Sequence, residues 1–160
     1  MIRFAACAAL AWSLAASAVS AQAITLRGAD GQTAALTSAD VAAMPHVTLT
    51  FAIEGKDRTF SGVPLAALLA RVGAPSGPAL RGKDLRDVVI VSAVDGYLAA
   101  FALAETDPAV RHEPILLADR ESGAPLQPKE GPFRLVVGGD LRGARMVRMV
   151  KAIEVRRLAP

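Results

Sequence analysis

The stretch FSGVPLAALLARVGA, residues 60–74, decides the architecture, because it is where the clearest amphipathic helix pattern of the chain follows a strand-like segment. Its apolar residues recur at helical spacing, Pro64 is tolerated in the first turn of a helix, and Gly73 is a common residue at a helix end. The stretch therefore predicts one main helix over residues 63–72, with Ser61 at the point where the chain enters it.

Short strand-like segments surround this helix, and they do not alternate regularly with other helices. A short helix over residues 39–44, capped by Ser38, is the second helix that the pattern indicates. Arg134 lies inside a strand pattern, so its side chain should lie on a sheet face. The expected strands cover residues 24–27, 32–36, 47–53, 58–60, 87–93, 97–103, 115–118, 133–137 and 151–155. This order predicts an α+β fold: a single domain with a mixed, mostly antiparallel sheet and one main helix.

The first 21 residues have the three-part pattern of a secretory signal peptide. A short basic start ending at Arg3 precedes an apolar run over residues 4–16 and a small-residue segment over 17–21. The alternative, a membrane anchor, is disfavoured because a spanning helix needs roughly 20 apolar residues. We expect a signal peptide over 1–21, cleaved after Ala21 or Ala23, and one domain over 22–160. That domain would be periplasmic or secreted, with no transmembrane segment after cleavage.

Composition excludes several classes of function. The net charge of +3 over 160 residues is too nearly balanced for binding a polyanion by bulk field, so nucleic acid is not an expected partner. His46 and His112 lie far apart and the only cysteine, Cys7, falls in the predicted signal peptide, so no protein metal site is expected. No serine-hydrolase or phosphate-loop motif occurs. Glu105 and Asp107 form either an acid/base pair or, as we favour, a solvated turn.

Positive charge gathers in GGDLRGARMVRMVKAIEV, residues 138–155. Arg142, Arg145, Arg148 and Lys151 follow one another at spacings of three. A run of this kind is either a solvated basic face or a cradle for an anion. A phosphate prefers guanidinium forks together with backbone N–H groups, and Gly143 would allow the backbone to approach closely. Both interpretations stay open at this point.

Four stretches in order resemble the molybdopterin-binding domain of the sulfite oxidase family: FSGVPLAALLARVGA, VSAVDGYLAAFAL, PILLADRESGAPLQPKEGPFRLVV and GARMVRMVKAIEV. The similarity runs from about residue 47 to residue 155. It implies a pterin cofactor, molybdopterin, that carries molybdenum on its dithiolene. It also implies that Tyr97 corresponds to the active-site tyrosine, and that Arg145 and Arg148 contact the pterin and its phosphate. With Arg142 and Gly143 these are the candidate cofactor-binding residues, and Tyr97 is the candidate catalytic residue. The alternative for Tyr97 is a hairpin tyrosine packed on the sheet.

The chain departs from the family pattern at the metal. The position of the molybdenum-ligating cysteine falls on Ala52, or on Thr50 if the gap is drawn differently, and neither supplies a thiolate. Three hypotheses follow. The chain is a degenerate or partial relative that holds molybdopterin or a related phosphate-bearing ligand. Alternatively, it is a cofactor-free periplasmic binding or sensory module that acts on a partner protein. The third hypothesis is an active molybdenum oxidoreductase without a protein thiolate.

Overall fold

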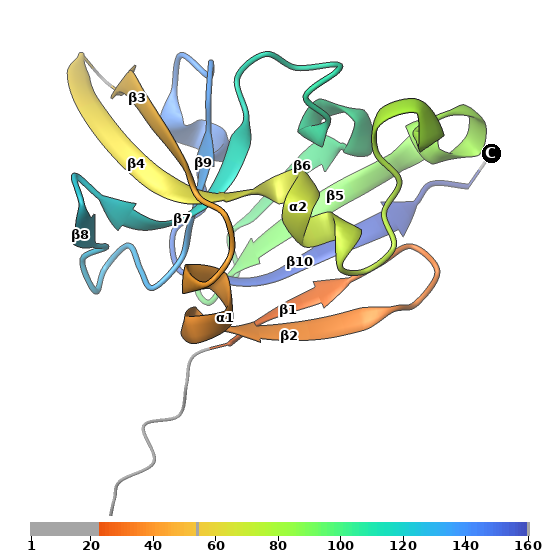
Figure 1. Ribbon diagram of the computed structural model, residues 1–160, viewed down its shortest axis with the longest axis horizontal. Helices are drawn as coiled ribbons and strands as arrows, with labels where there is room; N and C mark the ends of the chain where they lie inside the picture. Colours follow the sequence, from red (N-terminus) through yellow and green to blue (C-terminus); the bar gives the residue numbers. More distant parts are fainter. Residues whose placement is uncertain (1–22, 54, 160) are drawn as a thin grey trace, which may run out of the picture.

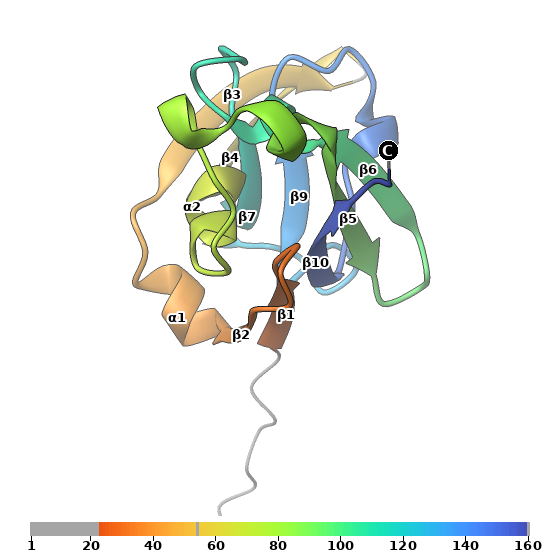
Figure 2. The ribbon, with the colours of Figure 1, turned by 90° about the vertical axis from the view of Figure 1, so that its right-hand side faces the viewer.

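Two five-stranded sheets and two short α-helices make up the part of the chain that the computed structural model describes, residues 23–53 and 55–159 (Figure 1). The predicted signal peptide over 1–21 lies outside these residues. In Figure 2, α1 (Ser38–Ala42) and α2 (Leu65–Ala70) lie on one side of the molecule, with β5, β6 and β10 on the other. The α+β class, the single domain and the mostly antiparallel pairing are confirmed, but the strands form two sheets instead of one.

The first sheet joins the beginning of the described chain to its end. Its strand order is β2-β1-β10-β5-β6, and only the β1–β10 pair is parallel. The strand β10 therefore lies between the N-terminal hairpin and the β5–β6 hairpin. The strands are β1 (Ala23–Arg27), β2 (Thr33–Thr37), β5 (Asp87–Ala93), β6 (Leu98–Ala102) and β10 (Val150–Arg157).

The second sheet is antiparallel and has the order β3-β4-β7, with β8 and β9 both paired to β7. The pairing of β9 covers residues 115–118 of β7, and that of β8 covers Arg120 and Glu121. The strands are β3 (Val47–Ile53), β4 (Lys56–Pro64), β7 (Ile115–Glu121), β8 (Ala124–Pro125) and β9 (Arg134–Val137).

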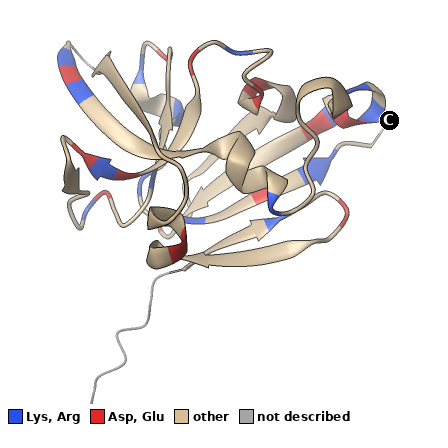
Figure 3. Cartoon of the chain, viewed as in Figure 1, with Lys and Arg blue, Asp and Glu red and all other residues tan. Residues whose placement is uncertain are grey.

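Alternation along the strands creates the core between the sheets. In β5, every second residue is buried, so Val89 and Val91 pack inward beside Ile153 of β10. The helix α2 adds Leu65, Leu68 and Leu69 to the same cluster. Charged residues lie mainly in loops and toward the ends of strands (Figure 3). Within the described residues, no helix is long and apolar enough to cross a membrane.

The main helix is shorter than predicted. The strand β4 runs through Pro64, which pairs with Leu116 of β7, and Ser61 lies inside that strand. A register shift between Ser61 and Gly62 brings β4 so close to β7 that a Cβ on Gly62 would lie 2.5 Å from the Cα of Ala118. The predicted start at residue 63 was wrong because sheet pairing holds Pro64 in an extended conformation.

The first helix is capped one residue earlier than predicted. The Thr37 hydroxyl accepts a hydrogen bond from the Asp40 N–H at 3.2 Å, and the Asp40 carboxylate accepts one from the Thr37 N–H at 2.8 Å. This reciprocal arrangement is a capping box, which satisfies amide groups that the helix itself leaves unpaired. The cap is therefore Thr37 and not Ser38, and the helix ends at Ala42 instead of residue 44.

Candidate functional site

Four arginines line one cavity of about 660 Å³, which we call the arginine cavity. Arg58 comes from β4 and Arg134 from β9, while Arg142 and Arg148 lie in the loop between β9 and β10. The volume is in the range of sites that bind small organic ligands or cofactors. Two strands and one loop, far apart in the sequence, thus meet at one concave, basic surface.

Acidic and aromatic groups also line the cavity. Asp95 and Tyr97 come from the turn between β5 and β6, and Glu130 comes from the segment before β9. The cavity therefore presents cationic donors for an anion and carboxylate acceptors for N–H groups of a ligand. Such a mixed lining suits a ligand that has an anionic part and a polar ring.

Two of the arginines are already neutralised by carboxylates. Arg58 donates to both carboxylate oxygens of Glu121 at 2.6 Å, and it also donates to Glu130 Oε2 at 3.0 Å. The same Glu130 oxygen accepts from Arg134 Nη1 at 2.7 Å. Burial alone would raise the pKa of Glu130, but the hydrogen bonds and charges of Arg134 and Arg58 outweigh it and lower that pKa. Glu130 is thus an ionised bridge in the cavity wall.

A phenyl ring supports the same two arginines. The guanidinium carbon of Arg58 lies 4.8 Å from the centre of the Phe60 ring, and that of Arg134 lies 5.3 Å from it. Arg134 is buried, and its Nε has no hydrogen-bond partner in the described part of the chain. The prediction of an ordinary sheet-face arginine was therefore incomplete, since Arg134 forms part of a cavity wall.

The other two arginines keep their charge available. Neither Arg142 nor Arg148 takes part in an ion pair within residues 23–53 and 55–159, and both are exposed. Gly143, beside Arg142, also lines the cavity and starts the short 3₁₀ turn Gly143–Arg145. A Cβ on Gly143 would meet only the Met146 sulfur, at 3.9 Å, so no neighbouring protein group requires a glycine there.

Arg145 does not line the cavity. It donates to both carboxylate oxygens of Asp140, at 2.9 and 2.7 Å, and to Glu105 at 3.0 Å. Its guanidinium carbon lies 4.9 Å from the ring centre of Phe101. The structure thus brings Tyr97, Arg142, Gly143 and Arg148 together and leaves Arg145 on a separate surface. The binding roles of all five residues stay predictions.

The hydroxyl of Tyr97 is engaged within the protein, where it donates a hydrogen bond to the carbonyl oxygen of Ala144. This contact ties the β5–β6 turn to the 3₁₀ turn that contains Gly143. The side chain is about half exposed, with 49% of the residue accessible. Tyr97 therefore has a structural contact in addition to its position in the cavity.

Ala52 and Thr50, on which the resemblance places the metal-ligating cysteine, do not line the arginine cavity. Ala52 lines a separate open cavity of about 430 Å³ with Gly139 and Leu141. The Thr50 hydroxyl is hydrogen-bonded to that of Thr59 at 2.9 Å. Among the residues that the structure describes, no group of three His, Cys, Asp or Glu side chains could hold a metal ion. The cavity thus offers guanidinium donors to an anionic ligand, and its two carboxylates, Asp95 and Glu130, do not form a three-residue metal cluster with other described residues.

The carboxylates of Glu105 and Asp107 are not a free acid/base pair. Asp107 is buried and accepts hydrogen bonds from the N–H groups of Gly77 and Ala109, the latter at 2.7 Å. Glu105 is paired with Arg145 and, at 3.5 Å, with Arg111. The favoured solvated turn was wrong for Asp107, because that carboxylate caps two loop segments from inside the protein.

Sequence reasoning missed Arg58 and Glu130 as site residues. Arg58 and Phe60 are two residues apart in β4 and share one face of it. Arg134 is the only charged residue in the apolar segment FRLVV. A charged side chain in an otherwise apolar strand was the available signal, because burying it requires partners. No local sequence pattern identifies Glu130. Its role depends on its contacts with Arg58 and Arg134, which only the fold brings together.

Comparisons with known proteins identify the family and the fold. The family model of the oxidoreductase molybdopterin binding domain matches residues 14–159. Among solved structures, the sulfane dehydrogenase SoxCD from Paracoccus pantotrophus has a similar fold, with a TM-score of 0.65 and 19% sequence identity. That similarity covers 86% of this chain, which spans only 39% of the SoxCD chain. No curated protein matches the chain. The chain belongs to the family of molybdopterin-binding domains of sulfite oxidase-type oxidoreductases.

Proposed function

We propose that this protein is an exported, partial relative of the molybdenum oxidoreductases that holds molybdopterin in the arginine cavity. One observation carries the proposal: Arg142 and Arg148 line the cavity without a carboxylate partner among the described residues. Guanidinium groups form short, charge-assisted and often bidentate hydrogen bonds with phosphate oxygens. A phosphate-bearing ligand would supply the missing anion.

The donor and acceptor set matches the two chemical parts of such a ligand. Arg142 and Arg148 would hold the phosphate, and the backbone N–H of Gly143 could contribute to the same oxygens. Asp95 offers a carboxylate for the N–H and amino groups of a pterin ring. When bound, the cofactor supplies a molybdenum–dithiolene centre suited to oxidation and reduction. The described residues supply the anion site but no thiolate for the metal. For this reason we call the protein a partial relative.

Cofactor content of the purified protein tests the proposal. The chain, with its own leader, is produced in a bacterium that makes molybdopterin, and pterin fluorescence and molybdenum are measured per mole of protein. We expect the double variant Arg142→Gln/Arg148→Gln to carry at least about tenfold less pterin than the wild type. The matched control is Arg81→Gln/Arg86→Gln, which removes two exposed charges outside the cavity. Equal pterin in both double variants would contradict the proposal.

A second candidate function rests on a different observation. Arg58 and Arg134 in the cavity wall, and Arg145 outside it, already have carboxylate partners, so much of the positive charge in this region is neutralised without any ligand. A cofactor-free periplasmic binding module would have this property. It predicts that the purified wild-type protein contains neither molybdenum nor pterin and is stably folded without them. The third hypothesis, oxidoreductase activity without a protein thiolate, requires a molybdenum EPR signal that responds to substrate.

Export is part of the same proposal, and it is supported by the charge and hydropathy pattern of residues 1–21. Cell fractionation tests it with the full chain and with a variant in which Leu10 and Leu14 are replaced by Asp. We expect the full chain in the periplasm or medium, shortened at its N-terminus, and the charged variant inside the cell. Recovery of full-length chain in the cytoplasm for both would contradict export.

A further inference from the structure

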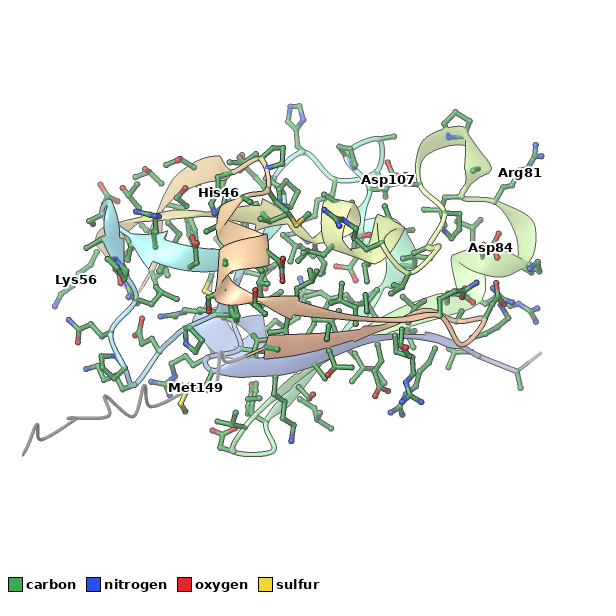
Figure 4. All side chains as sticks on the ribbon, turned by 60° about the horizontal axis from the view of Figure 1, so that its bottom comes forward. His46, Lys56, Arg81, Asp84, Asp107 and Met149 are labelled. Carbon is green, nitrogen blue, oxygen red and sulfur yellow. The ribbon has the colours of Figure 1, made fainter. Side chains whose placement is uncertain are left out.

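Met149 has a backbone conformation that is unusual for its residue type. Its φ angle is +48°, in the left-handed region that glycine and asparagine tolerate and other side chains disfavour. It lies between Arg148, which lines the arginine cavity, and Val150, which begins β10. In Figure 4 its side chain points outward from the ribbon, at the opposite end of the molecule from Arg81. Strained backbone of this kind is concentrated at functional sites.

The hydrogen bonds around Met149 show that one extra residue is inserted here. Leu135 N–H donates to Val147 O at 2.7 Å, and Val150 N–H donates to Phe133 O at 2.9 Å. A regular antiparallel ladder that starts from the first bond would place residue 149 opposite Phe133, but residue 150 is found there. Residues 147–150 thus contain one residue more than regular antiparallel pairing with residues 133–135 would need, an insertion that we call the bulge by analogy with a β-bulge.

The bulge changes the direction of the side chains. Val147 and Val150 are both buried, although in a regular strand residues three apart face opposite sides. Arg148, between them, is exposed and lines the cavity. The extra residue at Met149 therefore lets two valines enter the core while the arginine remains on the cavity side.

The backbone of Met149 also joins three segments of the cavity wall. Its N–H donates to the carbonyl oxygen of Glu130 at 3.0 Å, and its own carbonyl accepts from Val94 N–H at 3.1 Å. Glu130 lines the cavity, and Val94 precedes Asp95, which also lines it. These two bonds, with the chain connection to Arg148, fix the relative positions of three walls.

We infer that the left-handed backbone of Met149, and not its side chain, is the positioning element that aims Arg148 into the arginine cavity. The inference rests on the proposed anion-binding function and adds the residue that sets its geometry. Met149 acts through Arg148 and does not itself contact the ligand. Substitutions at this position should therefore rank by their tolerance of positive φ and not by hydrophobicity or size.

A series of four variants tests this ranking: Met149→Gly, Met149→Asn, Met149→Ile and Met149→Val. Glycine and asparagine accept the left-handed region, whereas the β-branched residues resist it. Binding of inorganic pyrophosphate, measured by titration calorimetry, should stay within about twofold of the wild type in the Gly and Asn variants. Binding should weaken at least about tenfold in the Ile and Val variants, because the hydrogen bonds from the Arg148 guanidinium to the phosphate oxygens would be lost. The reverse order, with Ile close to wild type and Gly or Asn weakened, would show a side-chain role and overturn the inference.

Amide hydrogen exchange separates failure of this inference from failure of the proposed function. The N–H groups of Met149 and Val94 should stay protected in the Gly and Asn variants and lose protection in the Ile and Val variants. If the wild type binds neither pyrophosphate nor pterin, the proposed function fails, and the exchange pattern still decides the role of the bulge. Equal protection of both amides across all four variants would refute that role.

Discussion

Arg145 and Asp140 form a bidentate ion pair in the loop that follows β9, with Arg145 Nε and Nη2 at 2.9 and 2.7 Å from the two carboxylate oxygens. The pair holds one arginine of the basic run over residues 142–151 away from the arginine cavity. It also fixes the loop that carries Arg142, because Asp140 and Arg145 bracket that residue. The ion pair thus separates a structural arginine from the arginines that face the cavity.

Asp140→Asn tests the contribution of this ion pair to stability and its dependence on pH. The Arg145 hydrogen bonds hold the pKa of Asp140 below its usual 3.8, so the unfolded chain takes up the proton first as the pH falls. The stabilisation is present above the unfolded pKa of 3.8 and is lost as the pH falls through the lower pKa of the folded state. We expect the free energy of unfolding of the variant to be lower by about 1 kcal/mol at pH 7, after allowance for solvent screening. That free energy should also fall less steeply than in the wild type as the pH is lowered. Urea denaturation between pH 3 and pH 7 measures both, with the exposed Asp57→Asn as control.

Glu130→Gln tests the ionised bridge in the cavity wall. Glutamine cannot neutralise Arg134 and Arg58, and Arg134 is buried. We expect a loss of about 2–3 kcal/mol in the free energy of unfolding, because an uncompensated buried charge remains. Chemical denaturation at pH 7 measures it. An equal effect from Glu113→Gln, an exposed position, would count against a specific role for the bridge.

Gly62→Ala tests the close approach of β4 to β7. The added Cβ would collide with the backbone of Leu117 and lie 2.5 Å from the Cα of Ala118, and neither can move without breaking the sheet. We expect destabilisation of about 3 kcal/mol or more. Gly143→Ala is the matched control for stability, since its Cβ meets only the flexible Met146 side chain at 3.9 Å. Thermal unfolding of both variants should show a large loss for Gly62→Ala and little change for Gly143→Ala.

Tyr97→Phe tests the hydrogen bond from the β5–β6 turn to Ala144. Because the tyrosine is half exposed, we expect a loss of only about 0.5–1 kcal/mol in stability. Amide exchange in residues 143–145 should nevertheless become faster, since the 3₁₀ turn loses a tether. If the exchange rates in this turn stayed unchanged while stability fell by the same amount, the hydrogen bond to Ala144 would not be the tether of the turn.

Local patterns predicted the strands well where one face is less exposed than the other. The alternation over residues 47–53 and the apolar run over 87–93 correspond to β3 and β5 as observed. The start of α2 was wrong because Pro64 suits both a helix start and a strand end, and pairing with Leu116 decides between them. The division into two sheets and the parallel pairing of β1 with β10 depend on contacts between distant segments, which periodicity does not encode.

The candidate site was predictable only in part. The spacing of Arg142 and Arg148 pointed to the loop between β9 and β10, and both residues line the arginine cavity. The same spacing could not show that Arg145 faces Asp140 and Glu105, because the bulge at Met149 and the turn at Gly143 break the regular repeat. The contributions of Arg58 and Glu130 come from other segments, and only the fold brings them to the cavity.

The position of β10 inside its sheet has a consequence for the order of folding. Until residues 150–157 have been synthesised, the β1–β2 and β5–β6 hairpins share no strand and have no hydrogen bonds to each other. A polypeptide that emerges from the ribosome N-terminus first therefore cannot complete this sheet during synthesis. The two hairpins therefore remain without their common neighbour until the last strand of the sheet has left the ribosome.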